Sequence, residues 1–293
     1  MARRDRSSSR RADGAGRGGK PRPGQGRKPP AQPRGGPPRD AAPRGGGRAA
    51  APQDAGGPEA SPPLPNVVYG RNAVREAVRG PRVVRTIWAT GRAAGEFEGA
   101  LPARAEEIAR RSGSDAHQGV CADVAEYRYA DAAALLAAPD PVLVALDEVT
   151  DPQNLGAVCR TAECTGATGV ILPERRSAEV TPAVCKASAG AVEHLSIARV
   201  RNLADFLADA KGADCWTYGA AAGARTSYRS VDWRGGVVLV LGAEGRGLRP
   251  RVAAACDDLV ALPLLGRIES LNVGAAAAVL LYEILQQRLD AST

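Results

Sequence analysis

The sequence predicts an α/β protein whose C-terminal half forms a doubly wound parallel sheet with helices on both faces. Two short, uninterrupted apolar segments, Val142–Leu146 and Gly236–Leu241, are typical of parallel strands buried on both faces. After the first segment, apolar residues recur at i, i+3, i+4 and i+7, as on one helix face: Leu155, Val158, Cys159 and Ala162. Strands and helices continue to alternate along the chain, which is the pattern of an α/β fold with a parallel sheet.

The later elements of this half continue the alternation from Gly166, which ends the first helix. Strands are expected at Gly169–Leu172, at Leu195–Val200, near Trp216 and at Leu259–Leu262, and helices at Thr181–Ser188 and Leu203–Ala210. The last helix starts after Ser270, a natural N-cap, and its first turns carry Gly274 and four consecutive alanines. So bare a face lets another backbone or a flat ligand approach closely. It predicts either a ligand pocket or a tightly packed buried helix.

A smaller α/β unit is expected over residues 64–130, followed by a linker at 131–140 and the larger domain at 141–293. Its helices are expected at Arg71–Arg79 and Ala103–Arg111, and its strands at Val83–Ala89 and Gly119–Val124. Pro102 stands just ahead of the second helix, where a proline suits a helix start.

The N-terminal segment differs sharply in composition from the rest of the chain. Residues 1–60 contain 14 Lys or Arg against 5 Asp or Glu, with 13 Gly, 10 Pro and no Val, Leu, Ile or aromatic residue. Such a segment has nothing to bury and cannot offset the entropy of ordering, so residues 1–63 are predicted to be a disordered basic tail. Its character suits salt-sensitive contact with RNA, or a solubilising extension without a specific partner.

Several classes of site are disfavoured. The six Cys form no CxxC pair and there are only two His, so neither a zinc site nor a disulfide framework is expected. Scattered cysteines of this kind predict that the protein is located in the reducing cytoplasm. No apolar segment reaches the roughly 18 residues of a membrane span. The glycine-rich segment Gly242–Gly247 is spaced GxxGxG rather than GxGxxG, and GxxxxGK[ST] does not occur. A Rossmann site and a phosphate-binding NTPase loop are therefore not predicted.

The polar residues of interest follow the predicted strands. In open α/β sheets ligands bind beyond the carboxyl ends of the strands, and three segments lie there: Asp147–Arg160, Gly242–Gly247 and Leu262–Asn272. They are the predicted location of the site.

Three motifs in these segments resemble those of the SpoU (TrmH) family of RNA ribose 2′-O-methyltransferases. They read DPQNLGAVCRTAECTGATGVILP, VLVLGAEGRGL and LPLLGRIESLNVGAAAAVLLYEI, and the likeness covers Pro141–Leu289 almost without a gap. The family belongs to the SPOUT class, so the resemblance implies a sheet that ends in a trefoil knot. Composition could not justify a knot, because knots are so rare.

The small unit resembles the L30e-like RNA-binding domain of the bacterial 23S ribosomal RNA guanosine methyltransferases. YGRNAVREAV and HQGVCADV carry this likeness. Between the helix at Ala103–Arg111 and His117, that domain usually has a further strand and helix, where this chain has a short turn. The resemblance therefore implies an RNA-binding domain that is shortened.

The resemblance implies S-adenosylmethionine as cofactor and assigns roles to residues of all three segments. Arg160 matches the catalytic arginine, but a guanidinium with a pKa above about 12 is a poor base, so a role in holding a phosphate and stabilising the 2′-oxyanion is preferred. The other implied catalytic residues are Asn154, Glu244, Ser270 and Asn272, of which Asn154, Ser270 and Asn272 could also be helix caps. Gly242, Leu262 and Leu271 match the adenosine pocket.

The expected substrate is RNA, most simply a guanosine of 23S ribosomal RNA or a large-subunit precursor. Transfer RNA, or the ribosomal site of antibiotic resistance, is the alternative within the enzymes, and a non-catalytic RNA-binding assembly factor is the alternative outside them. The class also implies a homodimer with the last helix at its interface. The apolar residues of that helix, Leu280, Leu281, Ile284 and Leu285, are consistent with this.

Overall fold

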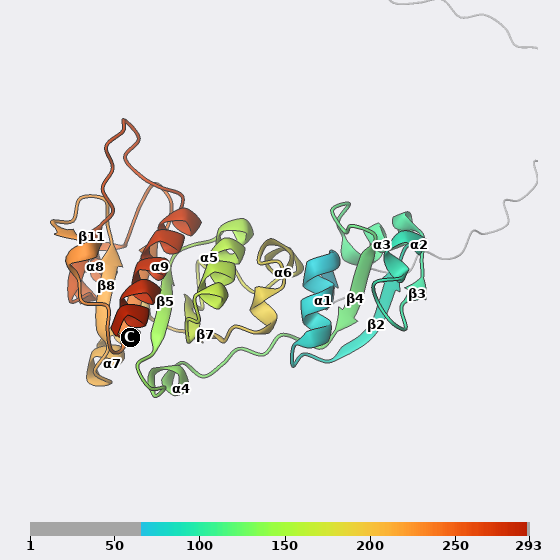
Figure 1. Ribbon diagram of the computed structural model, residues 1–293, viewed down its shortest axis with the longest axis horizontal. Helices are drawn as coiled ribbons and strands as arrows, with labels where there is room; N and C mark the ends of the chain where they lie inside the picture. Colours follow the sequence, from blue (N-terminus) through green and yellow to red (C-terminus); the bar gives the residue numbers. More distant parts are fainter. Residues whose placement is uncertain (1–65, 292–293) are drawn as a thin grey trace, which may run out of the picture. The chain divides into compact units, whose positions relative to one another are not determined.

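Two β-sheets organise the part of the chain that the computed structural model describes, residues 66–291 (Figure 1). All of these residues belong to one unit, Pro58–Thr293. The basic tail predicted for residues 1–63 lies outside the described residues.

The first sheet lies within the predicted small unit. It has four strands in the order β1-β4-β2-β3, with antiparallel β1/β4 and β2/β4 pairs and a parallel β2/β3 pair. Its strands are β1 (Val67–Tyr69), β2 (Val84–Ala89), β3 (Leu101–Pro102) and β4 (Val120–Val124), and its helices are α1 (Arg71–Arg79), α2 (Gly91–Ala94) and α3 (Ala105–Ser112). Helix α1 has the predicted bounds. Pro102 does not start a helix as expected, because it pairs with Ala89 in the sheet.

The second sheet is parallel throughout, which confirms the predicted α/β class. Its seven strands follow the order β7-β6-β5-β10-β8-β11-β9. Their bounds are β5 (Val142–Asp147), β6 (Gly169–Pro173), β7 (Ile197–Val200), β8 (Trp216–Ala220), β9 (Thr226–Ser227), β10 (Val237–Gly242) and β11 (Asp258–Ala261). The adjacent strands β5 and β10 are the two apolar segments from which the sheet was predicted.

Helices cover both faces of this sheet. They are α4 (Ala132–Leu136), α5 (Pro152–Cys164), α6 (Pro182–Ala187), α7 (Leu203–Gly212), α8 (Pro250–Ala255) and α9 (Val273–Ala291), with 3-10 turns η1 (Ala191–Glu193) and η2 (Tyr228–Ser230). Successive side chains of strand β5 point to the helices on opposite faces of the sheet. Val144 and Leu146 pack with α5, α6 and α9, while Leu143 and Ala145 pack with α4, α7 and α8. The predicted linker at 131–140 contains α4, which joins the second layer through Leu135 and Leu136.

A buried ion pair joins the segment before β2 to the turn η1. Arg82 donates to both carboxylate oxygens of Glu193, whose side chain is 1% exposed, and the guanidinium also lies over the ring of Tyr127. Burying two charges is favourable only when each is well paired, so this contact constrains both segments.

The six cysteines are all free, and they differ in burial. Cys121, Cys159, Cys185 and Cys215 are buried, Cys256 is half-buried, and Cys164 at the end of α5 is exposed. Burial raises the pKa of the Cys121, Cys185 and Cys256 thiols to about 11, which keeps them protonated and unreactive at neutral pH.

No helix among residues 66–291 is long and apolar enough to cross a membrane.

Candidate functional site

The three predicted segments meet at one edge of the parallel sheet. Strands β5 and β10 are paired in register, so that Asp147 lies opposite Gly242 at the carboxyl ends of both. The chain then continues from β5 into α5, from β10 into the glycine loop 243–248, and from β11 into the loop 262–272. The placement agrees with the rule that open parallel sheets bind ligands at this edge.

Three polar side chains, one from each segment, form a connected cluster. Asn154 donates through Nδ2 to Oε1 of Glu244 at 3.2 Å. Asn272 donates through Nδ2 to Oδ1 of Asn154 at 2.8 Å and to Oε1 of Glu244 at 2.5 Å. We call Asn154, Glu244 and Asn272 the amide cluster. It joins residues that are 28 to 118 positions apart in the chain.

Helix capping explains why Asn154 is available for this cluster. The cap of α5 is Asp151, which accepts a hydrogen bond from the Gln153 amide at 3.0 Å. The expectation that Asn154 caps the helix is therefore wrong, because Asn154 lies inside the first turn and its side chain is free to reach Glu244.

The start of α9 also differs from the expectation. Its cap is Asn272, whose Oδ1 accepts from the amides of Gly274 at 2.9 Å and Ala275 at 3.2 Å. Ser270 is not the cap, because the helix begins only at Val273 and a capping side chain must stand directly before the first turn. One amide side chain, that of Asn272, thus both caps the start of the helix and joins the cluster.

A cavity of about 460 Å³ lies beside the cluster. The glycine loop forms one side of it, and all three predicted cofactor residues, Gly242, Leu262 and Leu271, line it together with Ser270 and Glu244. The prediction missed Ala220–Ala222, which lie at the end of β8 and directly after it and line the same cavity. They lie at the same carboxyl edge as the other segments, so the edge rule could have identified them.

The cavity suits S-adenosylmethionine in size and lining. Ligand pockets for molecules of this size measure about 300 to 1,000 Å³ and present mostly apolar surface with a few polar groups. Leu262, Leu271 and Ala276 supply apolar surface, and the glycine loop supplies backbone. Gly245 and Gly247 have φ of +76° and +66°, a conformation that favours glycine, so the loop's path depends on them.

The bare face at the start of α9 packs against α5 and also lines the cavity. A side chain at Gly274 would press on Ala157 of α5, so the missing atoms allow the two helices to pack closely. Ala276 on the same helix lines the cavity.

A second cavity, of about 470 Å³, shares a wall with the first. Both are lined by Ala243, Glu244, Arg246 and Val273, and the second adds Asn154 and Arg176. Glu244 therefore stands between two spaces, one of which could hold a cofactor and the other a substrate.

Arg160 is not brought together with the cluster. Its side chain is exposed on α5, makes no hydrogen bond or ion pair within residues 66–291, and lines neither of these two cavities. Helix geometry explains this, because Arg160 follows Asn154 by six positions. Their side chains are about 9 Å apart along the axis and about 120° apart around it.

No group of three or more His, Cys, Asp or Glu side chains in the described part of the chain could hold a metal ion.

Comparison with known proteins agrees with this geometry. The SpoU rRNA Methylase family matches residues 141–282. The Bacillus subtilis protein YacO, whose name assigns it to the TrmH family of tRNA/rRNA methyltransferases, is 37% identical over 242 residues, covering 75% of this chain and 95% of YacO. The SpoU methyltransferase AviRb of Streptomyces viridochromogenes, solved with the cofactor AdoMet (S-adenosylmethionine), is similar with a TM-score of 0.65 and 25% identity, over 76% of this chain and 90% of AviRb. An AdoMet-bound rRNA methyltransferase of Sinorhizobium meliloti has a TM-score of 0.65 and 27% identity, over 75% and 87% of the two chains.

Proposed function

Because this chain belongs to the SpoU rRNA methylase family, whose cofactor is S-adenosylmethionine, we propose that it methylates a ribose 2′-hydroxyl of RNA. The observation that carries the proposal is the wall shared by the two cavities. A cofactor in the first cavity and a ribose in the second would meet beside Glu244. The proposed substrate is a guanosine of 23S ribosomal RNA.

The residues of this chain have to activate and position a weak nucleophile. S-adenosylmethionine supplies, when bound, a methyl group on a positively charged sulfur. A ribose hydroxyl attacks only when its proton leaves or its developing charge is stabilised. We assign the orientation of the ribose to the amide cluster and to Ser270, which lines the first cavity. We assign stabilisation of the oxyanion to Arg160, whose planar fork of N–H groups suits an anionic oxygen or phosphate.

We propose that the C-terminal half has the trefoil knot of the SPOUT class and that the small sheet is an L30e-like RNA-binding domain. Support for the knot comes from the way that later segments return to the end of β5: β10 pairs with β5, Arg249 bonds Asp147, and α9 packs on α5. The mixed four-stranded sheet with its flanking helices supports the second assignment.

We also propose a homodimer in which a second copy supplies Arg160. The residues first considered for the interface are not on the surface of this chain: Leu280, Leu281 and Ile284 are buried in its own core, and Leu285 is half-buried. Val279 and Tyr282 are instead exposed on α9, one helical turn apart. Since α5 packs on α9, an interface there would also include the exposed face of α5.

The variant Val279→Glu/Tyr282→Glu should be monomeric in light scattering at micromolar concentration, because it places charges in an apolar contact. Val83→Glu changes an equally apolar residue, 64% exposed in the small unit, and should leave the oligomeric state unchanged. A wild-type protein that is already monomeric would contradict the proposed dimer.

Asn272→Asp should separate the two roles of Asn272. Aspartate caps a helix as well as asparagine does, so the start of α9 should remain capped. The amide donors to Asn154 and Glu244 are lost, and a second carboxylate faces Glu244, so kcat for methyl transfer should fall about 10-fold or more. Asn202→Asp, at the cap of α7 away from the cluster, is the matched control and should keep its activity. Unchanged kcat in Asn272→Asp would remove the cluster from catalysis.

The function is tested by incubating the protein with methyl-labelled S-adenosylmethionine and, separately, 23S ribosomal RNA, ribosomal precursors and transfer RNA. A 2′-O-methyl ribose cannot cyclise, so the bond next to it survives alkali, and mass spectrometry then locates the nucleotide. We expect label in an alkali-resistant guanosine dinucleotide of 23S RNA. Label in transfer RNA would contradict 23S ribosomal RNA as the substrate, and label on a base would contradict methylation of the ribose. No label in any RNA would favour the non-catalytic assembly factor.

A further inference from the structure

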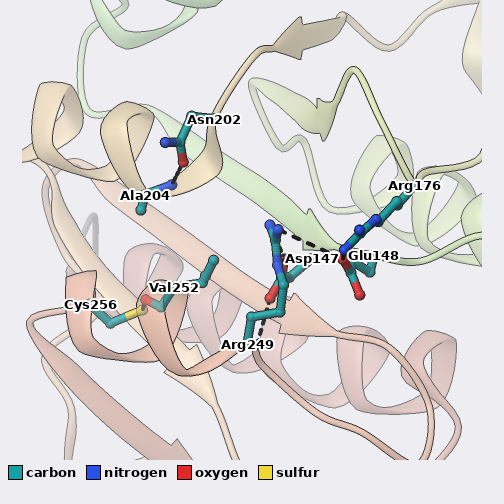
Figure 2. Close-up of polar contacts among 8 residues, drawn as sticks. All are labelled: Asp147, Glu148, Arg176, Asn202, Ala204, Arg249, Val252 and Cys256. Carbon is teal, nitrogen blue, oxygen red and sulfur yellow. Dashed lines mark hydrogen bonds and ion pairs between the residues drawn. The ribbon is translucent and has the colours of Figure 1, made fainter.

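Asp147, the last residue of β5, has a carboxylate that is held by a single residue far along the chain. Its side chain is fully buried. Oδ2 accepts a hydrogen bond from the backbone amide of Arg249 at 2.7 Å, and Oδ1 accepts from Arg249 Nε, also at 2.7 Å. Figure 2 shows this pair with Glu148 next to it. Oε1 of Glu148 lies 3.7 Å from Nη1 of Arg249. Asp147 and Arg249 are 102 positions apart.

The two contacts of Asp147 lie at the two ends of the glycine loop. In the parallel ladder Asp147 is the register partner of Gly242, the residue before the loop 243–248. Arg249, the residue after the loop, is the N-cap of α8. The loop also closes on itself, because the Gly247 amide donates to the Ala243 carbonyl at 2.9 Å. Asp147 therefore contacts the residues on both sides of the loop, Gly242 before it and Arg249 after it.

Loss of the contact would be more unfavourable for Asp147 than for Arg249. The side chain of Arg249 is 41% exposed, so water can solvate it in any loop position, whereas that of Asp147 is 0% exposed. A buried carboxylate without hydrogen-bond donors is strongly unfavourable, and the donors come from Arg249. Any displacement of the end of the loop would leave Asp147 unpaired, so the buried charge holds the loop in place.

We propose that Asp147 is a positioning residue that sets the glycine loop, and through it the affinity for S-adenosylmethionine and the place of Glu244. This inference rests on the proposed use of the first cavity for the cofactor. Asp147 lines neither that cavity nor the second one, so it acts only through the loop that lines both.

The test is Asp147→Asn, which keeps the size of the side chain. However the new amide is turned, its NH2 group faces one of the two Arg249 donors, and one hydrogen bond becomes a donor–donor contact. We expect the dissociation constant for S-adenosylmethionine, measured by calorimetry without RNA, to rise at least about 10-fold. We also expect faster hydrogen exchange at the loop amides, Gly247 above all.

Glu193→Gln is the matched control, because Glu193 is an equally buried carboxylate held by one arginine, Arg82. It should lower the melting temperature as Asp147→Asn does but leave cofactor affinity and loop exchange unchanged. If both variants weakened cofactor binding equally, the effect of Asp147 would be general destabilisation and the proposal would be overturned. The same holds if Asp147→Asn bound the cofactor like the wild type.

Arg249→Ala gives a second measurement should Asp147→Asn fold poorly. It keeps the backbone donor to Asp147, and because the arginine is partly exposed the protein should tolerate its loss. We expect Arg249→Ala to bind the cofactor more weakly and to exchange its loop amides faster than the wild type. Arg249→Lys should give a dissociation constant and exchange rates between those of the wild type and Arg249→Ala. A wild-type protein that bound no S-adenosylmethionine would refute the proposed function. Hydrogen exchange at the loop amides is measured without ligand, so it would still test whether Asp147 positions the loop.

Discussion

Replacing Arg160 with lysine should lower kcat for methyl transfer about 100- to 1,000-fold while the dissociation constant for S-adenosylmethionine stays unchanged. Lysine keeps the charge but loses the planar fork, and the loss of one group that stabilises an oxyanion has an effect of this size. Cofactor binding should be spared because Arg160 does not line the cavity beside the glycine loop. The measurement is single-turnover methylation of RNA together with calorimetry.

Arg251→Lys serves as the control for this variant. Arg251 is also on a helix, its side chain is 77% exposed, and its ion pair with Asp205 is on the surface, so turnover should not change. Mixing Arg160→Lys with Glu244→Gln subunits tests the source of the arginine. Activity above that of either parent would place Arg160 and Glu244 of one site in different subunits, whereas Arg160→Lys with wild-type turnover would remove the arginine from the mechanism.

Replacing Gly242 with alanine should weaken S-adenosylmethionine binding about 10- to 100-fold, because inserting a group into a filled site costs about 1–3 kcal/mol. A Cβ at Gly242 would not enter the cavity, since it would strike the backbone of Gly247 and Leu248 where the glycine loop closes. Even alanine must therefore push the loop outward, and valine must do so further.

Gly266→Ala is the control for Gly242→Ala. Gly266 lies between Leu262 and Leu271, which both line the cavity, but a Cβ there would meet nothing closer than the Ile268 amide at 4.0 Å. Calorimetry should give the wild-type affinity for this variant. If Gly242→Ala also bound like the wild type, the glycine loop would not form part of the cofactor site.

Elements with strong local signals were predictable from the sequence. The apolar runs that became β5 and β10 identified the parallel sheet, and α1 has its predicted bounds because glycines flank it at 70 and 80. The two-residue strand β9 and the six-residue helix α8 were missed, since segments so short carry no periodicity. The cap of α9 was misplaced because Ser270 and Asn272 are both good capping residues, and only the path of the loop decides between them.

The site was predictable as three segments but not as a set of contacts. The edge rule for parallel sheets located the segments, and the family resemblance selected Asn154, Glu244 and Asn272 within them. The bond between Asp147 and Arg249 was not anticipated, because a contact across 102 residues leaves no local pattern. The separation of Arg160 from Asn154 could have been inferred, because in the predicted helix positions 154 and 160 lie about 120° apart around the axis.

The unequal burial of the cysteines has a practical use. Four thiols are enclosed and a fifth is half-buried, so a maleimide dye added to the native protein should couple first at Cys164. Cys164 stands four residues after Arg160 on α5, which places the two on the same side of that helix. A fluorophore attached there, without any engineered residue, would report by its emission when nucleic acid or a neighbouring subunit covers that surface.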